Sequence, residues 1–148
     1  MIDNQVFGMT NDPLSPNFKK ALLNRLPERM AFWNLLGIEF VDVGSGWARM
    51  RMPFSEKLTN STGAGHGGAL FTLADSAGSM ALVSMAAKGE VVTTVEMKIN
   101  FLKPFVGGEA VAEAHILHCG KTTALGDVEI KDRDGSLIAK GSATLLRR

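Results

Sequence analysis

The stretch that decides the fold of this chain is His66-Gly67-Gly68-Ala69-Leu70-Phe71-Thr72-Leu73-Ala74-Asp75. It opens a run over residues 67–87 that is rich in Ala, Leu and Met and contains no proline, which predicts a helix of about six turns. Asp75 is the only charged residue in this run. A charge that is buried without a partner costs several kcal/mol, so Asp75 needs a functional or structural reason.

Length and composition indicate one domain with a sizeable core, because the chain has 148 residues. The 16 basic and 15 acidic residues nearly balance and form no blocks, so we expect no nucleic-acid partner. The single cysteine, Cys119, excludes an intramolecular disulfide and suits a reducing compartment. The N-terminal segment carries Asp3, Asn4, Asp12 and Pro13 and has no apolar signal-peptide core, which favours a cytoplasmic location.

The apolar run over residues 67–87 has the length of a membrane span. Asp75 near its centre would cost roughly 2.5–3.5 kcal/mol on insertion, and Gly, Ser and Thr dilute the remaining residues. We therefore expect no membrane association and interpret the run as a helix buried inside a soluble fold.

The remaining chain reads as short helices followed by strands. Residues 1–16 are expected to form an irregular arm, and Pro27 divides the amphipathic segment over residues 17–32 into two short helices. Alternating apolar and polar residues predict strands over residues 37–43, 47–54, 91–101, 109–118, 121–131 and 136–146. No βαβ alternation occurs, which favours an antiparallel sheet. The prediction is an α+β fold in which a curled antiparallel sheet wraps around one long central helix.

The segment around the helix start resembles a motif of the PaaI-like (phenylacetic-acid-pathway type) acyl-CoA thioesterases of the hotdog-fold superfamily. The matching residues are Asn60-x-x-Gly63-x-x-His66-Gly67-Gly68-x-x-x-x-Leu73-Ala74-Asp75. The resemblance extends over residues 35–146. It implies one hotdog domain over residues 1–148, with an N-terminal arm and helix over residues 1–34 and the hotdog core over residues 35–148.

The resemblance also implies roles for individual residues. The Gly67 N–H would donate to an oxyanion, and Asp75 would act as nucleophile or general base. Asn60 and His66 would organise substrate or water. A Ser or Thr on the strand after the helix would assist, which points to Thr94, with Thr93 as the adjacent candidate.

The chemistry also follows from the residues themselves. The first turn of a helix offers unpaired N–H groups and a positive dipole end. Gly67 and Gly68 in that turn allow close approach by a carbonyl oxygen that acquires negative charge. A carboxylate acts as a base on water or as the attacking group, and Asp75 is the one candidate in the helix.

The spacing of Gly67 and Asp75 predicts an oligomer. The two residues are eight positions apart, roughly 12 Å along a helix, which is too far for one aspartate side chain to bridge. If both act on one thioester, Asp75 must come from a second copy of the chain. Two helices lying antiparallel across a two-fold axis would create two equivalent sites, so we expect a homodimer or a dimer of dimers.

The expected substrate is an acyl-CoA. Its acyl chain would lie in an apolar tunnel between helix and sheet, and its pantetheine would run out between subunits. Gly68, Thr93 and Lys103 are candidate substrate-binding residues, and Lys98, Arg147 and Arg148 are further candidates for the nucleotide phosphates. No cofactor and no metal are expected, because His115, His118 and Cys119 make no convincing ligand set.

Other interpretations stay open at this point. The first is a non-catalytic hotdog protein that binds an acyl-CoA or a fatty acid, and the second is a hotdog dehydratase. Asp75, on a small polar stripe with Thr72, Ser76 and Ser79, also suits a structural carboxylate at a dimer interface. His66 also suits a helix-start residue, the paired glycines suit tight helix–sheet packing, and Asn60 suits a turn.

Overall fold

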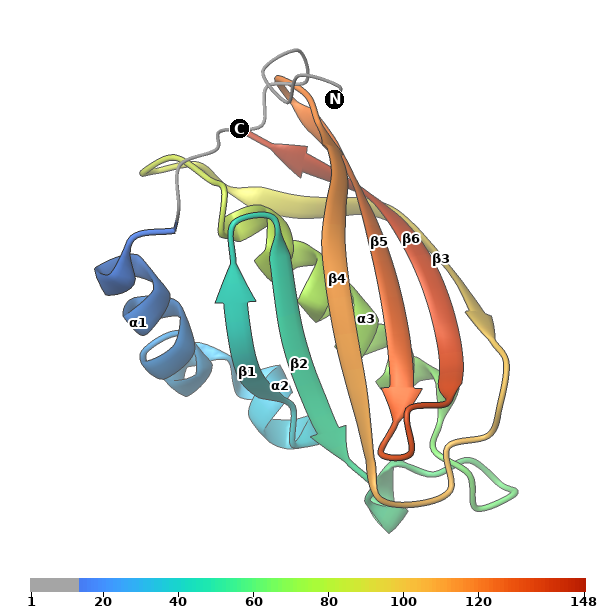
Figure 1. Cartoon of the computed structure of the whole chain (residues 1–148). Helices are drawn as coiled ribbons and strands as arrows, with labels where there is room; N and C mark the ends of the chain where they lie inside the picture. The colour runs from blue at the N-terminus through green and yellow to red at the C-terminus, as the bar shows by residue number, and fades with distance from the viewer. Residues whose placement is uncertain (1–13) are drawn as a thin grey trace.

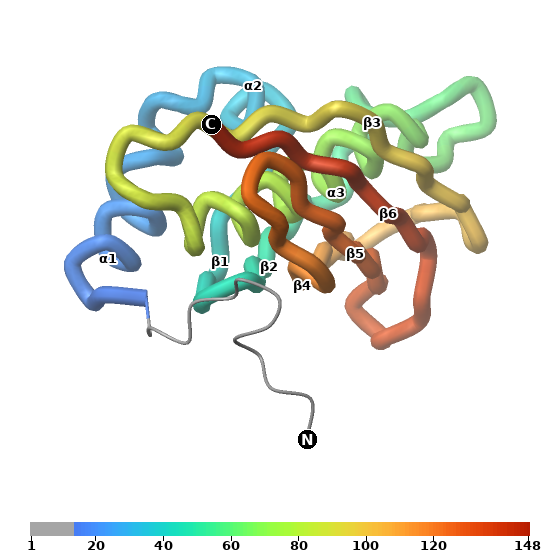
Figure 2. The backbone as a smooth tube through the Cα atoms, turned by 90° about the horizontal axis from the view of Figure 1, so that it is seen from above, coloured from blue at the N-terminus to red at the C-terminus, as the bar shows by residue number. Residues whose placement is uncertain are grey.

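Six antiparallel strands form one sheet in the order β1-β2-β4-β5-β6-β3. The sheet curves so strongly that the view from above shows it passing around α3 from β1 to β3 (Figure 2). The computed structural model describes residues 14–148, so the arm expected over residues 1–16 lies almost entirely outside the described residues. The predicted curled sheet around one long helix is confirmed (Figure 1).

The elements follow one another in the predicted order. The helices and 3-10 turns are α1 (Pro16–Asn24), η2 (Pro27–Arg29), α2 (Ala31–Leu36), η3 (Glu56–Leu58) and α3 (Gly67–Val83). The strands are β1 (Glu39–Gly44), β2 (Trp47–Pro53), β3 (Val92–Phe101), β4 (Glu109–Cys119), β5 (Thr123–Asp132) and β6 (Leu137–Arg147). The predicted break at Pro27 is confirmed, because α1 ends at Asn24 and Pro27 opens a separate 3-10 turn.

The core lies between α3 and the concave face of the sheet. α3 contacts all six strands, and its side chains Leu73, Ala77 and Ala81 are fully buried together with Met50 and Leu145 of the strands. Burial of one large aliphatic side chain contributes about 1.5–3 kcal/mol. Small residues on α3 let the helix lie close to the sheet, so side chains fill the space that the predicted acyl tunnel would need.

α3 is shorter than predicted. The apolar run continues to residue 87, but the helix ends at Val83. The hydroxyl of Ser84 donates to the Ala81 carbonyl at 2.7 Å and accepts the Gly46 N–H at 2.9 Å. Local serine hydrogen bonds compete with helix continuation, and here they also bind the helix end to the β1–β2 turn.

The N-terminal helices lie against the side of α3 through Trp33. This side chain is buried, and its Nε1–H donates to the Ser76 hydroxyl of α3 at 2.9 Å. Its ring also packs edge-on against Phe40 of β1, with 6.1 Å between the ring centroids. A buried indole N–H needs an acceptor, so the Trp33–Ser76 bond fixes α2 beside the position next to Asp75.

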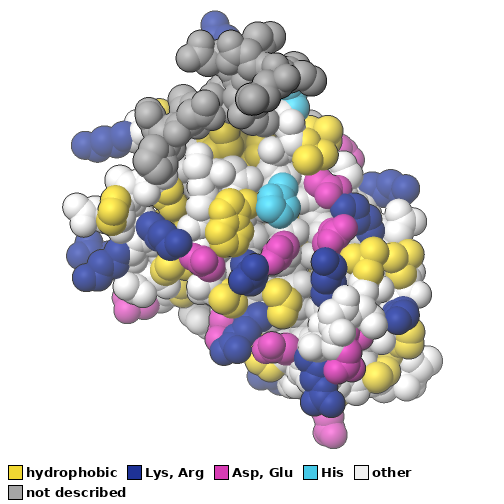
Figure 3. All heavy atoms as spheres, in the orientation of Figure 1, with side chains coloured by type: hydrophobic (Ala, Val, Ile, Leu, Met, Phe, Trp, Pro, Cys, Tyr) yellow, Lys and Arg dark blue, Asp and Glu magenta, His cyan; other side chains and the backbone are white. Residues whose placement is uncertain are grey.

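Paired charges cover the convex outer face of the sheet. Arg49 pairs with Glu113 across β2 and β4, and Arg51 pairs with Glu39 and Glu109. Figure 3 shows this face, where basic and acidic side chains lie side by side. Exposed pairs contribute roughly 0–1 kcal/mol each, so they make this face a solvated, charge-balanced surface. No helix in the described part of the chain has the length and apolarity needed to cross a membrane.

One ion pair closes the end of the sheet near the C-terminus. Arg147 donates to both carboxylate oxygens of Glu90, at 2.7 and 3.0 Å, and also to Cys119 Sγ at 2.9 Å. The Ala87 N–H and then the Arg147 guanidinium hold the pKa of Glu90 below its ordinary value of 4.5. Glu90 therefore stabilises the folded state above the carboxyl pKa of the unfolded chain, and this contribution is lost as the pH falls through the lowered pKa.

We predict that Glu90→Gln lowers the free energy of unfolding at neutral pH and that the difference from wild type shrinks in acid. Glutamine keeps an oxygen for the Ala87 N–H but lacks the charge that pairs with Arg147. Urea unfolding of both proteins between about pH 3 and 7 measures this difference. Glu28→Gln, at an exposed position of the η2 turn, is the control. A difference that stays constant with pH would contradict the assignment.

Candidate active site

The start of α3 leaves one backbone donor free. His66 is the N-cap residue, and its Nδ1 accepts the Gly68 N–H at 2.8 Å. The Ala69 and Leu70 N–H groups donate to the His66 carbonyl at 3.0 and 3.4 Å. Within residues 14–148 the Gly67 N–H has no acceptor. It is therefore the donor that a bound oxyanion would find at the positive end of the helix dipole.

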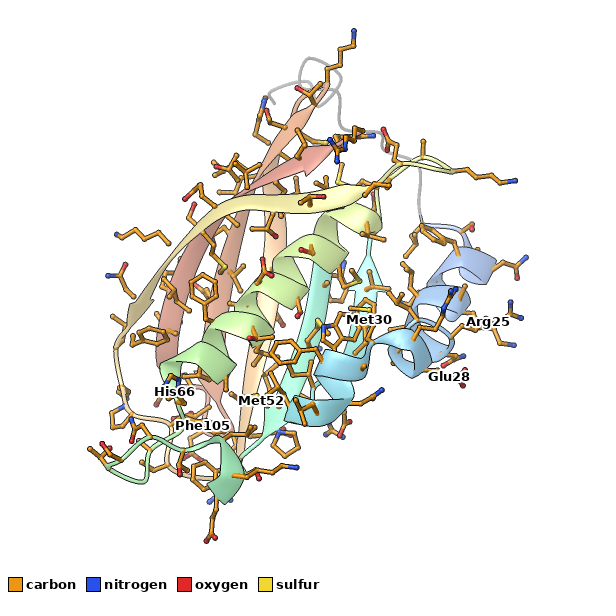
Figure 4. All side chains as sticks on the ribbon, turned by 180° about the vertical axis from the view of Figure 1, so that it is seen from behind. Arg25, Glu28, Met30, Met52, His66 and Phe105 are labelled. Atoms are coloured by element: carbon orange, nitrogen blue, oxygen red, sulfur yellow. The ribbon has the colours of Figure 1, made fainter. Side chains whose placement is uncertain are left out.

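Both glycines make close contacts at this helix start. A Cβ atom on Gly68 would lie 3.0 Å from His66 Nδ1, and a Cβ atom on Gly67 would lie 3.0 Å from Cζ of Phe101. Figure 4 shows His66 at the open end of α3. The absence of side chains allows the imidazole to fold back over the first turn and the Phe101 ring to approach from β3.

The loop before the helix is held by backbone hydrogen bonds. The Asn60 side-chain oxygen accepts from the Thr62 N–H at 2.9 Å and from the Thr62 hydroxyl at 2.7 Å. The Asn60 N–H donates to the Ala64 carbonyl, and the Gly63 N–H donates to the Asn60 carbonyl. Asn60 thus forms the turn that its residue type suggested, and it also lines the cavity beside Gly67.

Asp75 is half-buried and has one side-chain partner on β3. The Thr94 hydroxyl donates to Asp75 Oδ1 at 2.6 Å, and the Ser79 hydroxyl lies 3.3 Å from the Thr94 hydroxyl. Asp75 Oδ2 has no partner among the described residues. The structure therefore brings Thr94 to Asp75, whereas Thr93 is exposed and makes no such bond. Ser79 was expected on one polar stripe with Asp75 but was not among the candidate site residues, and its spacing of four residues from Asp75 is the signal for their shared helix face.

The single chain holds its free N–H and its carboxylate apart. Gly67 and Asp75 lie in the same continuous helix, so their separation along the axis is roughly 12 Å. This arrangement prevents the Asp75 side chain from meeting a carbonyl group that is bound at the Gly67 N–H of its own chain.

Two cavities flank the helix start. The β3-side cavity, of about 400 Å³, is lined by Gly67, Leu70, Phe101 and residues of the two adjoining loops, including Asn60 and Lys103. The α2-side groove, of about 250 Å³, is lined by His66, Gly68 and apolar side chains of α2 and α3. Gly67 lines the β3-side cavity, and its chain neighbours His66 and Gly68 line the α2-side groove on the other flank of the helix start.

The basic residues proposed for a nucleotide are not equivalent. Lys103 lines the β3-side cavity, and Lys98 and Arg148 are exposed. Arg147 is bound to Glu90 and Cys119, so its interpretation as a phosphate ligand is replaced by a structural one. Among residues 14–148, no three His, Cys, Asp or Glu side chains are placed to hold a metal ion together.

A long helix enclosed by a curled antiparallel sheet, with its N-terminal N–H open to a cavity, places the chain among the hotdog-fold proteins. The family model of the thioesterase superfamily matches residues 62–139. The chain belongs to this superfamily of thioester hydrolases.

Individual relatives agree with this family. Human acyl-coenzyme A thioesterase 13 is 32% identical over 128 residues, which cover 84% of this chain and 91% of the human protein. The E. coli PaaI protein, from the phenylacetic acid degradation operon, has a TM-score of 0.81 at 29% identity and covers 90% of this chain and 96% of that chain. A conserved Pseudomonas aeruginosa protein has a TM-score of 0.78 at 34% identity, over 82% of this chain and 98% of that one. The resemblance to PaaI-like thioesterases is therefore confirmed.

We predict that His66→Ala lowers the free energy of unfolding by about 1 kcal/mol, because it removes the side chain that caps α3. His66→Asn should restore most of that stability, since asparagine is a good N-cap residue but has no imidazole. Urea unfolding measures both variants. Equal stability of all three proteins would show that the His66–Gly68 bond contributes nothing, and the activity of the asparagine variant reports any further role of the ring.

Proposed function

We propose that this protein hydrolyses acyl-CoA thioesters to free CoA and a carboxylic acid. The observation that carries the proposal is the unpaired Gly67 N–H at the start of α3, open to a cavity. A thioester carbonyl oxygen that accepts this N–H gains negative charge when the carbonyl carbon is attacked. The fixed N–H and the helix dipole stabilise that charge more strongly than the ground state, which is the requirement for catalysis.

Asp75 supplies the second part of the reaction. Because Thr94 donates to Oδ1, Oδ2 is the oxygen left for the substrate side. As a general base, Oδ2 takes a proton from water while the water oxygen attacks the carbonyl carbon; as a nucleophile, it attacks directly and water then cleaves the anhydride. In both routes the C–S bond breaks, the thiolate leaves with a proton, and one water is consumed. Ser79 supports Thr94 from the next turn of α3.

A second copy of the chain is needed to complete this site, and β3 offers the surface for it. One edge of β3 pairs with β6, and the other edge has no partner strand among residues 14–148. Val95 is 60% exposed and Phe101 is 50% exposed on this strand. An unpaired edge with apolar side chains is prone to pair with another strand, which favours a two-fold dimer through the β3 edges.

Antiparallel pairing of two β3 strands about an axis between Met97 and Lys98 would bring Thr94 of one chain opposite Phe101 of the other. Phe101 lies against Gly67, and Thr94 is bonded to Asp75. The pairing would therefore bring the Asp75 of each copy towards the Gly67 of the other. Two shared sites result from one symmetry axis.

The choice of CoA as the thiol is supported by the relatives, one of which is named as an acyl-coenzyme A thioesterase. Lys103 and the polar groups of Asn60 and Thr62 line the β3-side cavity. This cavity lies towards the proposed dimer seam, so it suits the amide-bearing pantetheine arm. We assign Lys103 to the outer part of this arm, and Thr93 and Gly68 remain candidate contacts at the edges of the site.

Gly67→Pro tests the oxyanion donor. Proline is tolerated at the first position of a helix and removes the N–H, and the extended backbone of His66 before it (φ −64°, ψ 134°) is compatible with proline. Gly67→Ala is the matched control, because it adds a Cβ near Phe101 and keeps the N–H. We expect kcat to fall ~10²–10³-fold further in the proline variant than in the alanine variant, measured by thiol release from acyl-CoAs. Equal activity of the two folded variants would exclude this N–H from the reaction.

Asp75→Asn tests the carboxylate and the shared site together. We expect the variant to lose ~10²–10⁴-fold in kcat while it stays folded. Mixed dimers of Asp75→Asn with Gly67→Pro contain one site with both wild-type groups if the groups come from different chains. Such dimers should regain about half of the wild-type activity. Mixed dimers as inactive as their parents would place both groups in one chain, and full activity of Asp75→Asn would remove Asp75 from the chemistry.

A further inference from the structure

The α2-side groove has no role in the mechanism described above, although it begins at the same helix start as the β3-side cavity. Nine residues line it: Phe32, Leu36, Lys57, Leu58, Thr59, His66, Gly68, Ala69 and Thr72. Phe32 and Leu36 come from α2, outside the segment that matches the thioesterase superfamily model. We propose that this groove is the acyl-binding subsite and that Phe32 and Leu36 set the length of the acyl group. The proposal rests on the proposed acyl-CoA hydrolysis.

The assignment of the acyl group to this groove follows from the two directions in which a bound thioester can extend from the helix start. A carbonyl oxygen at the Gly67 N–H leaves one arm of the substrate on each side of the helix start. The β3-side cavity carries Asn60, Thr62 and Lys103 and lies towards the edge strand. The α2-side groove is lined by residues of α2, of α3 and of the segment before α3, on the flank away from the edge strand. The polar arm therefore fits the β3 side, and the acyl arm fits the groove.

Three side-chain polar atoms of the groove already have hydrogen-bond partners within the chain. The Thr72 hydroxyl donates to the Gly68 carbonyl at 2.9 Å, and the Thr59 hydroxyl donates to the Glu56 carbonyl at 2.7 Å. His66 Nδ1 accepts the Gly68 N–H. The surface left for a ligand is mainly that of aliphatic and aromatic side chains, and Lys57 stands at its exposed rim. Such a surface favours an apolar acyl group.

The outer wall of the groove is held in place. Trp33, next to Phe32, is buried and bonded to Ser76, so α2 cannot move far from α3 without breaking that bond. Phe32 itself is 56% exposed. A large aromatic side chain on a fixed helix, with one face open to a groove, gains burial when an acyl group fills the groove.

The size of the groove limits the substrate. The groove is open to solvent and has a volume of about 250 Å³. A methylene group is similar in size to a water molecule, which occupies about 30 Å³ in the liquid, so about eight carbon atoms fill the groove. The space behind α3 offers no alternative, because Leu73, Ala77 and Ala81 are fully buried there against the sheet. The substrate class is therefore a compact apolar acyl-CoA, of short to medium chain length.

The test is the chain-length profile of kcat/KM for straight acyl-CoAs from acetyl to dodecanoyl. For wild type, kcat/KM should rise by up to about fourfold per added methylene until the groove is full, near eight carbons, and then level off or fall. Phe32→Ala and Leu36→Ala remove one wall each, so they should lower kcat/KM for octanoyl-CoA about tenfold while acetyl-CoA changes less than about twofold. Leu35→Ala is the control, because Leu35 is 63% exposed on α2 and is not part of the groove.

Each possible profile of kcat/KM either supports or overturns the assignment of the groove to the acyl group. A chain-length-dependent loss in the Phe32 and Leu36 variants, with Leu35→Ala unchanged, supports it. A loss by the same factor for every acyl length would place the pantetheine arm in the groove and overturn it. A profile that Leu35→Ala alters equally would also overturn it. Failure of wild type to cleave any acyl-CoA would instead refute the proposed function itself, before any variant is compared.

Discussion

The structure depends on the enclosure of one apolar helix by a single curled sheet. α3 contacts every strand, and its sheet-facing side chains are small enough to lie directly on the strands, as at Ala74 and Ala77. The side of the helix that faces the sheet is therefore inaccessible. That one constraint leaves the unpaired Gly67 N–H at the helix start and the half-buried Asp75 as the polar groups that a ligand can reach.

The placement of Asp75 follows from the same constraint. A carboxylate within an enclosed helix needs a partner, and it finds one at the side of the helix where the sheet ends, on the edge strand β3. The same strand carries Phe101 against Gly67. The edge strand thus contacts both the carboxylate of Asp75 and the oxyanion donor Gly67. A second molecule that pairs with the edge of β3 would bring the Asp75 of one copy towards the Gly67 of the other. The opposite side of α3 is covered by α2. The helix start therefore lies between the β3 edge, which suits a partner chain, and α2 of its own chain.

Much of this arrangement was predictable from sequence, because it rests on local patterns. The apolar run after His66, the alternating strands and the Asp75 charge predicted the curled sheet around a helix. The predictions that failed or stayed open depend on contacts between distant residues. The helix ends at Val83 because Ser84 binds the Gly46 N–H. A register shift between Thr94 and Glu96 determines how β3 presents Thr94 and its neighbour Thr93. Arg147 was a candidate for the nucleotide phosphates, but Glu90 binds it. The Trp33–Ser76 bond joins residues 43 positions apart, and no local pattern contains it.

The paired charges on the outer face of the sheet have a kinetic consequence. Most basic side chains of β2, β5 and β6 lie beside acidic ones, as Lys140 lies beside Asp127 and Glu129, and the whole chain carries a formal charge of only +1. Opposite charges a few ångströms apart cancel each other's potential within about one Debye length, ~8 Å in physiological salt. This face therefore neither attracts nor repels a polyanion from a distance. Such a ligand is then attracted only by exposed basic side chains near the site, such as Lys103 at the β3-side cavity. The association rate should therefore depend only weakly on ionic strength.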